Sequence, residues 1–195
     1  MSAQLIHPFT FGDRTQSDLL GGKGANLAEM VRMGLPVPPG FTITTQACRE
    51  YLASGKMPSG LISEINNSLN DLEKSLDKKF GDPTKPLLVS VRSGAKFSMP
   101  GMMETVLNVG MTPDVAEGLA KISGNEKFAW DSYRRFIDMY GRIVCDVPPA
   151  EFHQIENRIL ESHSVKSIQE LDVAGLQALA AAFIKEIEIV TGKPF

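Results

Sequence analysis

The hydrophobic pattern changes near residue 110, and this change limits the folds open to the chain more than any other feature. Before it, short apolar runs bounded by Gly and Pro alternate with helical patterns, as in an α/β or α+β arrangement. After it the strand patterns stop, and several amphipathic helices are predicted, the strongest in FAWDSYRRFIDMYGRIV. We therefore expect an α/β subdomain over residues 1–110 and an all-helical subdomain over residues 111–195.

The composition argues against several classes of protein. The chain has 195 residues, 43% of them apolar and 22% charged, with a net charge of −3 at pH 7. A negative net charge gives no reason to expect a nucleic-acid partner, and no apolar stretch approaches the ~20 residues of a membrane span. The first residues lack the pattern of a signal peptide, and two distant cysteines do not indicate a disulfide framework. We expect a cytoplasmic protein.

The segment LLVSVRSGAKFSMPGMMETVLNVG contains the clearest candidate for a binding residue. Residues 87–91 are apolar except for one serine, which predicts a strand buried on both faces in the middle of a sheet. Arg92 follows this strand, at the carboxyl edge where open α/β sheets bind ligands. Its guanidinium could hold a phosphate through two hydrogen bonds. The alternative is an ion pair that stabilises the fold, with Asp82 or Glu104 as the carboxylate.

A second candidate lies in LLGGKGANLAEM, where three glycines surround Lys23 at the start of an amphipathic helix. Glycines let backbone N–H groups approach an anion, and the helix N-terminus adds partial positive charge. The spacing does not match a P-loop, because Lys23 is followed by Gly24 rather than by Ser or Thr. The alternative is a tight turn that serves only to begin the helix.

The residues that follow Arg92 have the composition of a mobile loop. Gly and Pro would set its shape, hydroxyl groups could donate hydrogen bonds, and three methionines offer soft apolar contacts suited to a lid. The methionines could equally fill a core. Farther on, Arg134 and Arg135 are interpreted as a surface pair, with contact to a phosphate as the alternative. No His or Cys arrangement indicates a metal site or a catalytic nucleophile.

Three blocks of sequence together resemble one known family. LLGGKGANLAEM with GLPVPPGFTITTQAC, then LLVSVRSGAKFSMPGMMETVLNVG, then FAWDSYRRFIDMYG are similar to the N-terminal nucleotide-binding region of pyruvate phosphate dikinases, in the same order and over essentially the whole chain. Phosphoenolpyruvate synthases share the GGKG and VRS elements but differ after VRS. The chain departs from many family members at Lys96-Phe97, where they have Arg-Ala, and at Glu104, where they have Asp. Both changes bear on how a lid would pack.

The resemblance implies the first lobe of an ATP-grasp-type nucleotide-binding fold, with the helical half as an inserted subdomain. It implies that Lys23 and Arg92 contact the phosphates of ATP, which binds together with Mg²⁺. It also implies that the loop SMPGMMET folds over the triphosphate. The candidate lid residues are Ser98, Gly101, Met103 and Thr105.

The family interconverts ATP, phosphate and pyruvate with AMP, pyrophosphate and phosphoenolpyruvate, through a phosphohistidine on a separate domain. We expect the second ATP-grasp lobe, the phosphohistidine domain and the pyruvate-binding barrel to lie outside this chain, which alone would be catalytically incomplete and hold no metal site. The implied partners are ATP or AMP, the phosphohistidine domain of the same full-length chain, and a second copy in a homodimer. Two alternatives stay open: a stand-alone nucleotide-binding or regulatory module, and the ATP lobe of a related dikinase with another acceptor.

Overall fold

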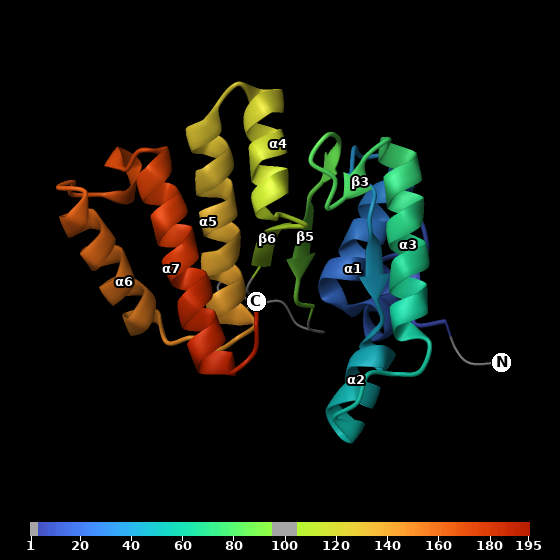
Figure 1. Cartoon of the computed structure of the whole chain (residues 1–195). Coiled ribbons are helices and arrows are strands. Elements are labelled where there is room, and N and C mark those ends of the chain that lie inside the picture. The colour runs from blue at the N-terminus through green and yellow to red at the C-terminus, as the bar shows by residue number, and fades with distance from the viewer. Residues whose placement is uncertain (1–3, 95–104) are drawn as a thin grey trace. The chain divides into compact units, whose positions relative to one another are not determined.

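The computed structural model describes residues 4–94 and 105–195 (Figure 1). They form a mixture of helices and short strands, which confirms the predicted α/β or α+β class at this coarse level. The chain divides into two compact units. One comprises Met1–Lys78 with Ser93–Met103, and the other comprises Lys79–Arg92 with Glu104–Phe195. Within the described residues, no helix has the length and apolar character needed to cross a membrane.

A two-stranded antiparallel sheet and three helices build the first unit. β1 (Ile6–Pro8) pairs with β2 (Phe41–Ile43), and Ile6 lies opposite Ile43. Leu5 and Ile6 are buried with residues from two helices in a small apolar core. The remaining elements of this unit are η1 (Arg14–Gln16), α1 (Ser17–Arg32), α2 (Thr45–Ser54) and α3 (Leu61–Leu76).

A carboxylate fixes α3 to the first strand. Glu64 of α3 accepts hydrogen bonds from the backbone N–H groups of Leu5 (2.9 Å) and Ile6 (3.0 Å) through the same oxygen. Hydrogen bonds to a charged acceptor are stronger than those between neutral groups. The position of α3 on the sheet is therefore set by directional bonds as well as by apolar packing.

The second unit contains two small sheets. β3 (Lys79–Phe80) pairs in parallel with β4 (Pro86–Leu87), and β5 (Val89–Arg92) pairs in antiparallel with β6 (Thr105–Val109). The prediction of one strand over residues 87–91, buried on both faces, is therefore wrong. Leu87 is buried, but Val91 is 54% exposed. A short apolar run does not reveal how many neighbours a strand has, and here the run is divided between two sheets.

Four helices make up most of the second unit, as the sequence pattern predicts beyond residue 110. α5 lies between α4 and α7, and α6 packs on the other side of α7 (Figure 1). Side-chain caps at Thr112, Asn125 and Asp172 begin three of these helices, each accepting a backbone N–H. The helices are α4 (Pro113–Ser123), α5 (Glu126–Ile143), α6 (Pro149–Ser162) and α7 (Val173–Thr191), with η2 (Ile168–Glu170) before α7.

The interpretation of Arg134 and Arg135 as a surface pair is wrong for Arg134. Only 8% of Arg134 is exposed, and its guanidinium donates two hydrogen bonds to Asp131, at 3.0 and 2.8 Å. The Arg135 side chain is 62% exposed and pairs with the other oxygen of Asp131 at 2.8 Å. A carboxylate one turn earlier on the same helix neutralises the buried arginine. Arg134 thus has a structural partner within its own helix.

Gly118 of α4 lies against the backbone of Pro83, and we predict that Gly118→Ala destabilises the protein. A Cβ at Gly118 would come within 1.8 Å of the Pro83 carbonyl oxygen, so one of the two backbones must move. Overpacking of this kind costs about 1–3 kcal/mol, more than the ~1 kcal/mol gained from the better helix propensity of Ala. Urea unfolding should show the loss, whereas Glu117→Ala on the exposed face should not. An unchanged or higher stability of Gly118→Ala would show that α4 and Pro83 are not in this contact.

The burial of His7 predicts how the free energy of unfolding depends on pH. It is buried and stacks on Phe11 with ring centroids 3.9 Å apart, and burial lowers the pKa of its imidazole below 6.5, although the Glu64 carboxylate acts in the opposite direction. The unfolded chain thus takes up a proton at higher pH than the folded chain. The stability that depends on neutral His7 is present above about pH 6.5 and is lost as the pH falls through the folded-state pKa.

We expect His7→Phe, which keeps a stacked ring, to flatten the pH dependence of the free energy of unfolding between about pH 7.5 and about pH 5. The wild-type slope from this residue is at most about 1.4 kcal/mol per pH unit, the limit for one proton. Urea unfolding at a series of pH values measures it. The exposed His153→Gln should keep the wild-type slope. Equal slopes for wild type and His7→Phe would rule out this role.

Candidate functional site

A backbone break inside α1 creates the turn that carries Lys23. Gly21 has φ 69° and ψ 164°, which is not helical, so the helix breaks there and resumes at Gly22. This region of φ and ψ is open essentially to glycine alone. Lys23 is partly buried in the first turn of the resumed helix, as the sequence pattern predicts. The positive end of the helix dipole and the lysine charge therefore lie at the same place.

Packing accounts for a second glycine of the motif. A Cβ at Gly24 would come within 2.8 Å of both the Oγ1 and the Cγ2 of Thr42, so α1 approaches β2 closely only because no side chain is present. Gly21 and Gly24 thus have different physical roles, one in backbone conformation and the other in close packing. Both roles are structural, and they fit a turn that only begins the helix as well as they fit an anion site.

The turn at Gly21 lies beside two other segments of the first unit. A Cβ placed on Gly21 would be 4.0 Å from the backbone of Gly94 and 4.0 Å from the Cγ2 of Thr45. Gly94 follows Arg92 by two positions, so the glycine of VRSG lies beside the turn of GGKG within the first unit, although about seventy residues separate them in the sequence. Thr45 also donates a hydrogen bond from Oγ1 to the carbonyl oxygen of Asp18, at 2.5 Å.

Thr44, the residue before Thr45, caps α2. The Oγ1 of Thr44 accepts from the N–H of Ala47 at 3.3 Å, and the Thr44 N–H donates to the carbonyl of Leu5 at 2.9 Å. A pair of threonines at a strand-to-helix junction leaves one hydroxyl free to bond elsewhere.

Arg92 ends β5 and is exposed, opposite Thr105 at the start of β6. Among the residues that the structure describes, none forms an ion pair with Arg92. Asp82, one of the proposed partners, accepts from Thr84 N at 2.7 Å, Thr84 Oγ1 at 2.6 Å and Lys85 N at 3.2 Å. These hydrogen bonds, those from Thr84 above all, lower the pKa of the Asp82 carboxyl. The other proposed partner, Glu104, lies outside the described residues.

The predicted lid residues are described only in part. Thr105 is partly buried at the beginning of β6. Ser98, Gly101 and Met103 lie outside the described residues. The connection from β5 to β6 comprises residues 93–104, and its two ends are paired in the ladder at Arg92 and Thr105. The connection therefore leaves β5 directly after Arg92 and enters β6 at Thr105, which lies opposite Arg92.

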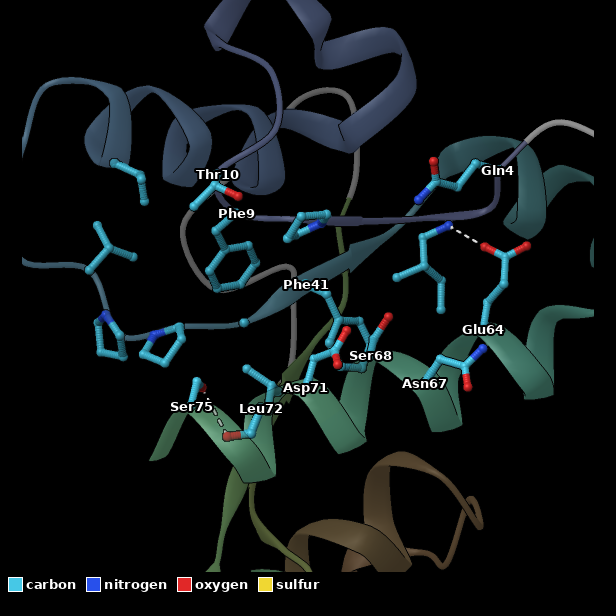
Figure 2. A pocket seen from close by; sticks show the side chains of 17 residues that line it. Gln4, Phe9, Thr10, Phe41, Glu64, Asn67, Ser68, Asp71, Leu72 and Ser75 are labelled. Atoms are coloured by element: carbon cyan, nitrogen blue, oxygen red, sulfur yellow. Dashed lines mark hydrogen bonds between the residues drawn. The ribbon is translucent and has the colours of Figure 1, made fainter. Parts of the chain in front are cut away.

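A hollow of about 680 Å³ lies elsewhere in the first unit, between the sheet and α3. Figure 2 shows the rings of Phe9 and Phe41 on the sheet side, with Glu64 and Asp71 on α3. None of the described residues that line it is Lys, Arg or His. Two carboxylates without a cation would repel a polyphosphate. The hollow, which sequence reasoning did not predict, is therefore unsuited to the phosphates of a nucleotide.

A family model described as pyruvate phosphate dikinase, AMP/ATP-binding domain, matches two overlapping stretches, residues 17–73 and 49–134. Together they cover more than half of the chain. The chain belongs to this family. Lys23 lies in the first stretch and Arg92 in the second, so both candidates fall within the dikinase match.

Pyruvate, phosphate dikinases from three distant organisms are similar to the chain over nearly its whole length. The protein from Entamoeba histolytica is 47% identical over 98% of this chain and 22% of its own length. That from Clostridium symbiosum is 48% identical over 93% and 21%. The chloroplastic form 1 from Zea mays is 48% identical over 94% and 19%. The chain thus spans about a fifth of the length of these dikinases.

We predict that Gly21→Ala lowers the free energy of unfolding by about 1–3 kcal/mol, the range for a residue forced into a glycine-only backbone region. Gly55→Ala is the matched control, because Gly55 also has a positive φ (64°) but lies in the left-handed region with no neighbour within 4 Å. Its loss should be smaller, near 1 kcal/mol. Urea unfolding of both variants measures the difference. An equal loss in the two would mean that Gly21 is not under a special backbone constraint.

Proposed function

We propose that this chain supplies phosphate-binding groups to the ATP site of a pyruvate phosphate dikinase, with Lys23 and Arg92 as the residues that contact the phosphates. The observation that supports the proposal is that Gly94, two residues after Arg92, lies beside the Gly21 turn that precedes Lys23. The similarity of the chain to an AMP/ATP-binding domain gives the ligand class.

The two residues would hold phosphate in different ways. Lys23 is a compact positive charge at the beginning of a helix, where backbone N–H groups and the helix dipole also favour an anion. Arg92 has a planar guanidinium that can donate two parallel hydrogen bonds to one phosphate. Among the described residues neither forms an ion pair, so a phosphate would not have to displace a described carboxylate.

The connection between β5 and β6 is proposed as the nucleotide lid. Its ends are joined at the pair Arg92–Thr105, so a movement of the connection would begin beside a phosphate-binding residue. Thr105 could donate from its hydroxyl at this hinge position. The lid residues within the connection would be Ser98, Gly101 and Met103.

At the level of the fold, we propose that residues 1–110 form most of the first lobe of an ATP-grasp-type fold and residues 111–195 an inserted helical subdomain. The parent enzyme would interconvert ATP, phosphate and pyruvate with AMP, pyrophosphate and phosphoenolpyruvate through a phosphohistidine domain. This chain alone would be catalytically incomplete. Homodimerisation and a cytoplasmic location stay predictions.

Mg²⁺ would accompany ATP and neutralise part of the charge on its phosphates. Among the described residues, no three Asp, Glu, His or Cys side chains gather where they could hold a metal ion. Lys23 and Arg92 are the described residues that we propose to contact the phosphates. The metal ligands are proposed to lie mostly in the second lobe.

The test is calorimetric titration of the chain with Mg-ATP. Arg92→Ala should weaken binding by about 1.5–3 kcal/mol, the range for hydrogen bonds to charged groups, and Lys23→Ala should weaken it by a similar amount. Arg158→Ala and Lys56→Ala remove exposed cations elsewhere and should leave the affinity unchanged. Thermal unfolding of each variant should match the wild type. Loss of stability instead of affinity in Arg92→Ala would contradict the proposal, as would equal losses in the controls.

A further inference from the structure

Thr45 occupies the junction between the Gly21 turn and the start of α2. The neighbouring Thr44 is 1% exposed. Its hydroxyl accepts a hydrogen bond from the N–H of Ala47, and its own N–H donates to the carbonyl of Leu5, which ties the start of α2 to the chain just before β1. The backbone from which the Thr45 side chain projects is therefore held in place. Its side chain makes no cap for its own helix and instead reaches 27 residues back along the sequence, to Asp18.

The bond from Thr45 meets α1 just before the break. Carbonyls in the last turn before a helix break lose their intrahelical donors and need new ones. The Thr45 hydroxyl supplies a donor to the carbonyl of Asp18 at 2.5 Å, three residues before Gly21. The short helical segment that leads into the turn is therefore held at one end by a side chain from another helix.

The methyl group of Thr45 lies beside the turn. Its Cγ2 lies 4.0 Å from the position that a Cβ on Gly21 would take, and the backbone of Gly94 lies at the same distance from that position. A glycine-rich turn has many accessible conformations and loses more entropy on ordering than other sequences do. The Thr45 side chain and the Gly94 backbone lie near the same side of Gly21, and such neighbours reduce the conformations that the turn can adopt before a ligand arrives.

From these contacts we infer that Thr45 is a positioning residue for the phosphate-binding turn. Its hydroxyl fixes the segment before Gly21 and its methyl group lies beside the turn, so that the N–H groups and Lys23 that follow are held in the orientation for phosphate. Thr45 acts through the turn and does not itself contact the nucleotide. This inference rests on the proposed function of Lys23 and Arg92.

The test compares Thr45→Val, which keeps the methyl group and the shape but loses the hydroxyl donor, with Thr45→Ser, which keeps the donor. Thr10→Val, at an exposed threonine, is the matched control. In calorimetric titration with Mg-ATP, Thr45→Val should bind about 3- to 10-fold more weakly, as expected for the loss of one hydrogen bond. Thr45→Ser should recover most of the affinity. Thermal unfolding should be little changed in all three.

Amide hydrogen exchange of the chain without nucleotide gives a second, independent measurement. Thr45→Val should speed exchange at Gly22, Lys23 and Gly24, whereas Thr45→Ser and Thr10→Val should not. Unchanged exchange in Thr45→Val would overturn the inference whatever the nucleotide affinity. Unchanged affinity in Thr45→Val, with Lys23→Ala and Arg92→Ala still weakened, would overturn the inference alone. If those two variants bind like wild type, the proposed function fails as well.

Discussion

The backbone conformation of Gly21 is the constraint on which the candidate site depends. Its φ of 69° and ψ of 164° break α1 and make a new helix start at Gly22. Without that break, Lys23 would lie in the middle of a continuous helix, where the backbone N–H groups are already bonded and the dipole offers no concentrated positive charge. The break also creates the turn beside which Thr45 and Gly94 lie. One glycine conformation thus connects the local backbone to the proposed chemistry.

Charge distinguishes the Gly21 turn from the hollow beside α3, the two regions of the first unit considered as binding sites. The Gly21 turn offers a helix N-terminus and Lys23, which suits an anion. The hollow beside α3 has Glu64 and Asp71 and, among its described lining residues, no compensating cation. Glu64 has a clear structural role there, since it binds two backbone N–H groups of the first strand. The hollow is therefore a poorer candidate for the phosphates of a nucleotide than the Gly21 turn, and charge decides between them.

Much of the local structure could be predicted from the sequence, because caps and periodicity are local signals. The helices beyond residue 110 and the helix start near Lys23 are examples. The predictions that were wrong concern residues whose environment depends on partners distant in the sequence or on the orientation of the side chain. Val91 looked buried but is exposed, because an apolar run does not specify a second neighbouring strand. Arg134 looked exposed but is buried, because its orientation on α5 decides its environment. The hydrogen bond from Thr45 to Asp18 could not be predicted, because its acceptor lies in another helix.

The measurement that tests the central claim most directly is paramagnetic relaxation from Mn-ATP, read at the backbone amides of this chain by NMR. The ion bound to the triphosphate broadens nearby amide signals, so the pattern locates the phosphates without any mutation. The account predicts the strongest broadening at Gly22, Lys23 and Gly24, with Gly94 and Thr105 also affected. Broadening centred on Glu64 and Asp71 in place of the Gly21 turn would contradict it.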